Sequence, residues 1–303
     1  MTSTNGVRGG GVVVKVGGRA QSDPALAPAL IALWRRTGAR APLCVVHGGG
    51  DEVSALQRAA GVEPVFVGGR RVTSVDDIDR LRMALSGVAN KRLVSALSTA
   101  ARTGGANAPS AIGLSGEDGR LIVADLLDDG SIGAVGAVSS VNAPLISLLS
   151  TLGYLPVVAP VAAASDAARS RWTARGLGAA PFALNVNGDD AAGAVAAAIG
   201  ASELLYVSDV SCVRIDGMPV SELTSEAALA AIGRGEITGG MIAKVESALA
   251  ALDRGVSRVR IGSTGMLDGS EPGTTLVAGA AFGAVVGTAP DADRRSSAAE
   301  VLT

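Results

Sequence analysis

Short apolar runs alternate with longer segments rich in alanine and leucine along most of the chain. The runs are apolar at nearly every position, which is typical of strands buried on both faces of a parallel sheet. They predict strands at 12–16, 43–46, 110–114, 120–124, 154–159, 203–209 and 257–263. The segments between them predict helices at 24–37, 51–60, 76–102, 142–152, 189–200, 225–234 and 240–254. We therefore expect an α/β fold with helices on both faces of a mainly parallel central sheet.

The charge and composition of the chain exclude several classes of function. A net charge of -2 over 303 residues gives no electrostatic reason to expect nucleic acid or a membrane surface as a partner. A single histidine excludes a multi-histidine metal site, and Cys44 and Cys212 are expected to be reduced core thiols. Residues 133–165 are uncharged, but asparagine, proline and glycine interrupt them, so we expect no membrane span. The N-terminus lacks the apolar region of a signal peptide, which favours the cytoplasm.

Two glycine clusters follow predicted strands. Gly17 and Gly18 come after 12–16, and residues 48–50, all glycine, come after 43–46 and lead into a predicted helix. Ligands collect at the carboxyl ends of parallel strands, and glycine amides can turn towards one phosphate there. Neither cluster is a P-loop, because no Gly-Lys dipeptide occurs, or a complete dinucleotide fingerprint, because Val53 stands at its last position. Each cluster is therefore a phosphate site or an ordinary turn.

Lysine is rare in this chain, which has 26 lysines and arginines together. Only Lys15, Lys91 and Lys244 are lysines. Lys15 ends a predicted strand, directly before the first glycine cluster. Lys244 lies near the start of a predicted helix, where a positive charge costs roughly 0.3–1 kcal/mol. A bound anion would remove that conflict, and a solvated lysine is the alternative.

An acidic partner for these lysines lies in the segment ALNVNGDD. Asn185 and Asn187 alternate onto one face of an extended stretch, and Asp189 or Asp190 is expected to cap the next helix. Two amides on one face of a strand end need partners, which indicates a binding site there.

Eight segments, taken in order, resemble the amino acid kinase family over about residues 12–287. They are VVVKVGG, VVHGGGDEV, GGRRVTSVDDIDRLRMALSGVANKRLV, GLSGEDG, GYLPVVAPV, ALNVNGDD, LLYVSDVS and ITGGMIAKVESAL. The resemblance implies a three-layer αβα sandwich. An N-terminal lobe (12–182) would bind an N-acylated glutamate, and a C-terminal lobe (183–288) would bind ATP. An arm (1–11) and a flexible tail (289–303) would flank them, and 164–181 would be an exposed excursion between the lobes.

The resemblance also implies roles for single residues. Lys15 and Lys244 would neutralise the transferring phosphoryl group, and Asp189 would hold both lysines in place. The residues implied to bind the acylated amino acid are Gly49, Gly50, Arg71 and Asn185. Those implied to bind ATP are Gly17, Gly18, Asp209, Ser211 and Thr238. Mg²⁺ would be held mainly through the ATP phosphates, with no set of protein ligands of its own.

This chemistry agrees with the residue types. A carboxylate acceptor is already ionised at neutral pH, so its attack on phosphorus needs no general base. The barrier is charge repulsion, which fixed cations and backbone amides lower. The compact ammonium of a lysine suits one phosphoryl oxygen better than the longer guanidinium of arginine.

The sequence departs from the family pattern at several points. Cys212 stands where glycine is usual, and Arg70 adds a second cation beside Arg71. His47 is expected to be structural, and the role of Lys91 stays open. Only 14 residues precede Lys15, which favours a homodimer over a hexamer joined by N-terminal helices. Three alternatives remain: a kinase acting on aminoadipate or glutamate attached to a carrier protein, a catalytically silent sensor, and a dinucleotide-dependent oxidoreductase.

Overall fold

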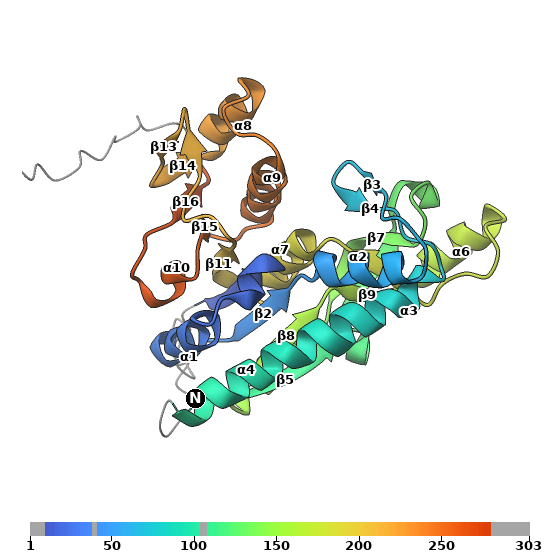
Figure 1. The fold of residues 1–303 in the computed structure, drawn as a ribbon, viewed down its shortest axis with the longest axis horizontal. Coiled ribbons are helices and arrows are strands. Elements are labelled where there is room, and N and C mark those ends of the chain that lie inside the picture. Colours follow the sequence, from blue (N-terminus) through green and yellow to red (C-terminus); the bar gives the residue numbers. More distant parts are fainter. Residues whose placement is uncertain (1–9, 38–40, 104–107, 280–303) are drawn as a thin grey trace, which may run out of the picture.

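One large sheet organises the molecule. The structure is a computed structural model, and it describes residues 10–37, 41–103 and 108–279. Most of the expected arm (1–11) and the whole expected tail (289–303) lie outside these residues. Eight strands form the sheet in the order β14-β16-β15-β11-β1-β2-β8-β5 (Figure 1). All neighbours run parallel except β15 and β16, so the predicted mainly parallel sheet is confirmed.

The elements follow the predicted alternation closely. The strands of the large sheet are β1 (Gly11–Val16), β2 (Leu43–His47), β5 (Ser110–Ser115), β8 (Tyr154–Ala159), β11 (Ala201–Val207), β14 (Glu222–Thr224), β15 (Arg258–Gly262) and β16 (Thr274–Val277). The α-helices are α1 (Leu26–Thr37), α2 (Gly50–Ala59), α3 (Asp77–Leu81), α4 (Asn90–Thr103), α5 (Ala143–Thr151), α6 (Asp166–Ala174), α7 (Gly188–Ala198), α8 (Ser225–Gly233), α9 (Gly240–Asp253) and α10 (Gly265–Asp268).

Helices cover both faces of the sheet, as expected for an αβα sandwich. Successive side chains of a strand point to opposite faces. On β1, Val12, Val14 and Val16 pack with apolar residues of α1, α4 and α10, whereas Val13 packs on the other side with residues of α7 and α9. Lys15 therefore faces the α7 side, at the carboxyl end of a fully buried strand.

A second, smaller sheet was not anticipated from the sequence. It is a closed barrel of β10 (Ala183–Val186), β7 (Val135–Val141), β6 (Ile122–Leu126) and β9 (Val161–Ala164). The predicted strand 120–124 contributes to this barrel and not to the large sheet. β10 pairs with β7 and β9, so it lies with strands that precede residue 183. Alanine is as common as valine in these short strands and carries no strong strand signal.

Most of the expected excursion at 164–181 is exposed, including residues 173–179. Within it, residues 166–174 form α6, whose Ala168 and Trp172 lie four residues apart on one buried face. Arg171 also forms an ion pair with Asp129. The segment is therefore held to the barrel by a short apolar stripe that the sequence analysis did not identify.

The predicted single helix at 76–102 is three consecutive segments, α3, a π-helical stretch at Arg82–Ala89, and α4. Arg82, at the first junction, pairs with Glu117 at 2.6 Å. No helix within the described residues is both long enough and apolar enough to cross a bilayer.

Two hairpins complete the described chain, β3–β4 (Phe66–Val67 with Arg70–Arg71) and β12–β13 (Arg214–Ile215 with Met218–Pro219). Gly68 and Gly69 form the turn of the first with positive φ angles of 53° and 74°. Positive φ at both turn residues matches the twist of a two-residue hairpin and favours glycine. Figure 1 shows this hairpin projecting beside α2.

Candidate active site

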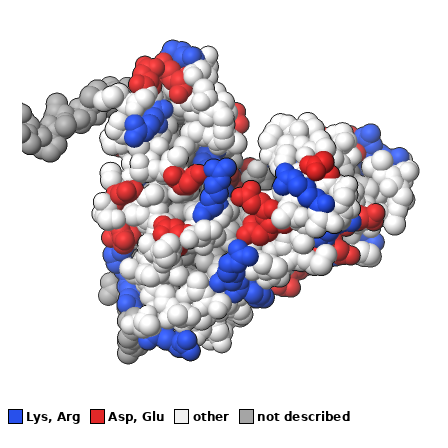
Figure 2. All heavy atoms as spheres, in the orientation of Figure 1, with Lys and Arg blue, Asp and Glu red and all other residues white. Residues whose placement is uncertain are grey.

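Two adjoining cavities lie at the carboxyl ends of the central strands. The smaller, of about 160 Å³, contains the predicted substrate residues Gly49, Gly50, Arg71 and Asn185. The larger, of about 510 Å³, contains Lys15, Gly17, Gly18, Asp209 and Lys244. Gly50 belongs to both linings. Figure 2 shows the notch between the part that carries α9 and the hairpin side, with basic and acidic side chains along it.

The two glycine turns lie against each other. The amide of Gly17 donates to Val207 O at 2.9 Å, and that of Gly48 donates to Val16 O at 2.9 Å, so β11 anchors the first turn and β1 the second. A Cβ added at Gly18 would lie 3.8 Å from the nitrogen of Gly49 and 3.9 Å from that of Gly50. The second turn then enters α2 at Gly50. Backbone amides and a helix N-terminus therefore share one small space, which is an arrangement that suits a phosphate.

The side chain of His47 is hydrogen-bonded to the second glycine turn. Its side chain is fully buried; Nδ1 contacts Gly48 O at 2.8 Å, and Nε2 contacts Nδ2 of Asn90 at 3.1 Å. These partners require a neutral ring that donates through Nδ1 and accepts through Nε2. Burial lowers the pKa of His47, although the hydrogen bond to Gly48 opposes that shift. The contacts support a structural role for this residue.

His47 should make the protein less stable in mild acid. An unfolded chain takes up a proton near pH 6.5, whereas the buried ring, with its lowered pKa, does not until lower pH. The free energy of unfolding should therefore fall as pH drops from 7.5 to 5, by at most about 1.4 kcal/mol per pH unit. Urea unfolding of the parent and of His47→Gln across this range measures the effect. Since the chain has one histidine, the variant should lose most of the slope; an unchanged slope would contradict this.

The N-terminus of α7 places Asp189 on Lys15. The cap of this helix is Asn187, whose side-chain oxygen accepts from the amides of Asp189 (2.7 Å) and Asp190 (3.4 Å). The expectation of an aspartate cap is therefore wrong. Because Asn187 caps the helix, the carboxylate of Asp189 is free to contact Nζ of Lys15 at 2.7 Å.

The Lys15–Asp189 pair is buried, with 8% of each residue exposed. Nζ of Lys15 and Oδ1 of Asp189 attract each other as an ion pair. Tyr206 donates to the backbone oxygen of Asp189 at 3.2 Å and fixes this turn of the backbone. Lys15 also lines the larger cavity, so its ammonium can reach a ligand there.

Lys244 lies across the larger cavity from Lys15, on the second turn of α9. The helix is capped by Gly239, at φ 58°, with no side-chain hydrogen bond to its amides. No described carboxylate lies within 4 Å of Nζ of Lys244, so the predicted contact between Asp189 and Lys244 is not formed here. That contact stays a prediction.

Of the other residues predicted to bind ATP, Asp209 lines the larger cavity, whereas Ser211 and Thr238 do not. Asp209 lines the larger cavity and pairs with Arg19 at 2.9 Å, and the hydrogen bond from Arg19 lowers the pKa of Asp209. Ser211 and Thr238 are exposed and do not line this cavity. Cys212 is half-buried beside Ser211 and is not a core thiol as expected, whereas Cys44 is buried; both are free.

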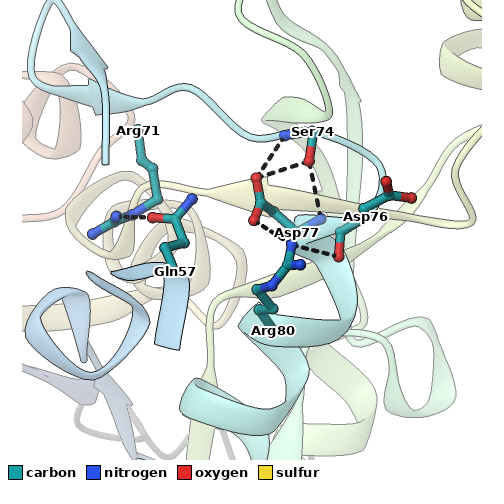
Figure 3. A network of polar contacts seen from close by, with 6 residues as sticks. All are labelled: Gln57, Arg71, Ser74, Asp76, Asp77 and Arg80. Atoms are coloured by element: carbon teal, nitrogen blue, oxygen red, sulfur yellow. Dashed lines mark hydrogen bonds and ion pairs between the residues drawn. The ribbon is translucent and has the colours of Figure 1, made fainter. Parts of the chain in front are cut away.

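Arg71 extends from the hairpin into the smaller cavity and is 8% exposed. Nη2 donates to Gly50 O and to Oγ of Ser54, both at 2.8 Å, and Nη1 donates to Oε1 of Gln57 (Figure 3). The ring of Phe66 lies 4.7 Å from the guanidinium carbon. All these partners are neutral, and no described carboxylate lies within 4 Å of the guanidinium. Burial lowers the pKa of Arg71, and the negative charges of Asp77 and Asp51 oppose that shift from more than 4 Å away.

A polar network stands behind Arg71. Asp77 accepts hydrogen bonds from the amide and hydroxyl of Ser74 and from Arg80 (Figure 3). Burial raises the pKa of this carboxyl, but hydrogen bonds from Ser74, Arg80 and Gln57 outweigh it and leave the pKa below its usual range. Gln57 therefore connects the carboxylate of Asp77 to Arg71. Ser54 and Gln57 escaped the sequence analysis, although their spacing puts both on one face of α2.

Asn185 lines the same cavity from β10, and its Nδ2 donates to Oγ1 of Thr73 at 2.9 Å. Among the described residues, the side-chain oxygen of Asn185 accepts no hydrogen bond. Lys91 is outside both cavities and donates to Gly113 O and Oδ1 of Asn90, each at 3.1 Å. This supports a structural role for Lys91.

The donor set of the larger cavity suits a polyphosphate. This cavity is lined by two lysines, Arg19, residues of both glycine turns and the carboxylates of Asp51 and Asp209. Within the described ranges, no group of three or more His, Cys, Asp or Glu side chains is arranged to hold a metal ion. A polyphosphate that brings its own Mg²⁺ is matched by this combination of cations and amides.

A mainly parallel sheet with two adjoining cavities at its strand ends, each lined by basic side chains, is the arrangement of an α/β protein that can hold two anionic ligands side by side. A sequence profile of the amino acid kinase family matches residues 11–263, and the chain belongs to this family. The resemblance inferred from the motifs is thus confirmed.

Relatives extend this result. The chain is 39% identical over 270 residues to an acetylglutamate kinase of Cereibacter sphaeroides, a match that covers 88% of this chain and 83% of that protein. It is 41% identical over 252 residues to an acetylglutamate kinase of Chloroflexus aurantiacus, with 82% and 90% covered. A crystal structure of a protein from Streptococcus mutans UA159 matches with a TM-score of 0.71 and 27% identity, covering 88% of this chain and 98% of that one.

Proposed function

We propose that this protein transfers the γ-phosphoryl group of ATP to the side-chain carboxylate of N-acetyl-L-glutamate, a step of arginine biosynthesis. The names of the relatives that are 39% and 41% identical support this acceptor. The observation that carries the proposal is the buried guanidinium of Arg71, which has only neutral partners in a cavity adjoining Lys15, Asp189 and Lys244. A buried cation whose direct partners are all neutral is well suited to bind an anionic ligand.

The two cavities correspond to the two substrates in this proposal. N-acetyl-L-glutamate binds in the smaller cavity, with one carboxylate on Arg71 and its polar groups near Asn185. ATP binds with its phosphates in the larger cavity, against the turns at Gly17 and Gly49. Gly50, which belongs to both linings, lies where the two ligands meet. A division into an acceptor lobe, 12–182, and an ATP lobe, 183–288, is part of the same proposal.

The residues of the chain contribute position and charge. The acceptor carboxylate attacks without losing a proton, so no side chain acts as a base. The ammonium groups of Lys15 and Lys244 and the glycine amides neutralise the charge that spreads over the transferring group. Asp189 holds Lys15 at 2.7 Å and is proposed to reach Lys244 once nucleotide is bound. Mg²⁺, when bound to the phosphates, supplies further neutralisation of their charge.

ADP formation tests the proposal. Purified protein with ATP and Mg²⁺ is expected to release ADP when N-acetyl-L-glutamate is added, and far less with L-glutamate, N-succinyl-L-glutamate or N-acetyl-L-aspartate. ADP release with a different acceptor alone would contradict the proposed substrate. An absence of ADP with every acceptor, together with tight ATP binding, would favour a sensor or a carrier-bound substrate.

A homodimer in the cytoplasm is also part of the proposal. β5 is an edge strand of the large sheet, and α5, which packs on the neighbouring β8, exposes Leu148 and Leu152 at 57% and 64%. An apolar face beside an open sheet edge suits contact with a second copy. Light scattering after gel filtration should give about twice 29.8 kDa, and Leu148→Glu with Leu152→Glu should shift the mass towards that of one chain. A parent mass of 29.8 kDa would contradict the dimer.

A further inference from the structure

Thr73 connects two residues that line the smaller cavity. Its side-chain hydroxyl donates to the backbone oxygen of Arg71 at 3.0 Å and accepts from Nδ2 of Asn185 at 2.9 Å. Arg71 and Asn185 both line the cavity, whereas Thr73 does not line it and is fully buried. Arg71 belongs to the hairpin β3–β4 and Asn185 to the barrel strand β10. Thr73 therefore joins the hairpin to the barrel beside this cavity.

Backbone hydrogen bonds fix Thr73 against the barrel. Its amide donates to Ile132 O at 3.1 Å, and its backbone oxygen accepts from the amide of Ala134 at 2.6 Å. The backbone oxygen of Ala134 in turn accepts from the amide of Asn185 at 2.9 Å. A Cβ added at Gly133 would overlap the backbone oxygen of Thr73, so this close approach requires glycine. The positions of Thr73 and Asn185 are therefore set by the backbone, independently of their side chains.

The hydroxyl of Thr73 determines which way round the amide group of Asn185 lies. A threonine hydroxyl has one hydrogen to donate, and a backbone oxygen can only accept. Because Thr73 donates this hydrogen to Arg71 O, its Oγ1 is an acceptor towards Asn185. Only the Nδ2 end of the Asn185 amide can donate to it. The reverse orientation would bring two acceptor oxygens together in a buried position.

This orientation leaves Asn185 with an unused acceptor. Among the described residues, Oδ1 of Asn185 accepts no hydrogen bond, yet it is not one of the buried polar atoms that lack a partner. Oδ1 is therefore accessible, and it belongs to a residue that lines the smaller cavity. Nδ2 is turned instead to Thr73, which does not line the cavity. A ligand in the cavity thus meets an acceptor at Asn185.

We propose that Thr73 is a positioning residue that sets the amide of Asn185 so that the acceptor substrate must offer an N–H group there. This inference rests on the proposed function. In N-acetyl-L-glutamate the N–H belongs to the acylamide, and it would donate to Oδ1 of Asn185. An ester in place of that amide would bring oxygen against oxygen. Thr73 does not touch the substrate and acts through Asn185.

Calorimetry without nucleotide tests this inference with two ligands. N-acetyl-L-glutamate is compared with the acetate ester of L-2-hydroxyglutarate, in which oxygen replaces the N–H and both carboxylates and the acetyl group remain. The parent should bind the amide about 10- to 100-fold more tightly, because the ester leaves Oδ1 of Asn185 without a partner. In Thr73→Val the Asn185 amide can turn either end to the ligand, so the preference should fall to about threefold or less. Thr73→Ser keeps the hydroxyl and should retain the parental preference.

Thr274→Val is the matched control. Thr274 is equally buried, and its hydroxyl likewise accepts from one backbone group, Val213 N, and donates to another, Val220 O, away from the smaller cavity. This variant should leave the preference unchanged. Arg70→Gln removes a different attachment of the hairpin, the contact of Arg70 with Asp190 at 2.7 Å. Since both ligands carry the same carboxylates, it should affect them alike.

Two results with Thr73→Val would overturn the inference. They are an unchanged preference for the amide and equal weakening of both ligands, since the hydroxyl would then only hold the hairpin in place. Thr73→Ala serves if Thr73→Val does not fold, and the same loss of preference is expected. A parent that binds the amide and the ester equally well would also rule the inference out. A parent that binds neither ligand would contradict the proposed function itself.

Discussion

Lys15→Arg is expected to lower turnover by about 100- to 1,000-fold, the effect of losing one positioned charge stabiliser, while binding of both substrates changes little. The charge survives in this variant, but its position does not. Nζ of Lys15 contacts Asp189 at 2.7 Å, and a Cβ at Gly188 would already lie 3.6 Å from Cε of Lys15. The longer, planar guanidinium cannot take the same place without moving the N-terminus of α7.

Turnover and the two dissociation constants, measured separately, check this prediction. Lys91→Arg is the matched control, because Lys91 lies outside both cavities and donates to Gly113 O on β5. It should keep parental turnover. Parental turnover in Lys15→Arg would remove Lys15 from the phosphoryl site.

Arg71→Lys is expected to raise the KM for N-acetyl-L-glutamate by about 10- to 100-fold, with a smaller change in turnover. The guanidinium of Arg71 has three partners on one wall of the cavity, namely Gly50 O, Ser54 and Gln57. An ammonium cannot bind these groups and a carboxylate in the same fork. The lost charge-assisted hydrogen bonds correspond to about 1.5–3 kcal/mol.

Arg58→Lys is the control for this variant, because its ion pair with Glu63 is exposed. Steady-state kinetics at saturating ATP should show a raised KM in Arg71→Lys only. An unchanged KM would exclude Arg71 from the acceptor site. A large loss of turnover with an unchanged KM would place Arg71 on the transferring group and not on the carboxylate that does not react.

The central sheet could be predicted because its strands are apolar on both faces. The run at 12–16 is interrupted only by Lys15, and the alternation of side chains on β1 fixes the face to which that lysine points. Gly17, Gly49 and Gly50 could likewise be placed, since parallel strands end at one edge of the sheet. Local sequence was therefore sufficient to predict where Lys15 and the two glycine turns lie.

The rest of the site depends on contacts distant in sequence. Arg70 and Asp190 are 120 positions apart, and nothing local to either residue indicates their ion pair. Asparagine and aspartate cap helices equally well, so the sequence could not decide between Asn187 and Asp189. The position of Lys15 makes Asn187 the cap, because Lys15 attracts the carboxylate of Asp189 away from the helix amides. The barrel was missed because its strands are short and interrupt their valines with alanine and polar residues, so only the run at 120–124 gave a strand signal. The Gly68–Gly69 turn carried a hairpin signal that could have been used.

The central claim is that a phosphoryl group reaches the side-chain carboxylate of N-acetyl-L-glutamate. Hydroxylamine trapping tests it most directly, because an acyl phosphate reacts with hydroxylamine to give a hydroxamate. The protein would be incubated with ATP, Mg²⁺, hydroxylamine and N-acetyl-L-glutamate, and the product fragmented in a mass spectrometer. The account predicts a hydroxamate on the side-chain carbonyl, formed only with ATP. A hydroxamate on the α-carbonyl, or none despite ATP and N-acetyl-L-glutamate binding, would contradict it.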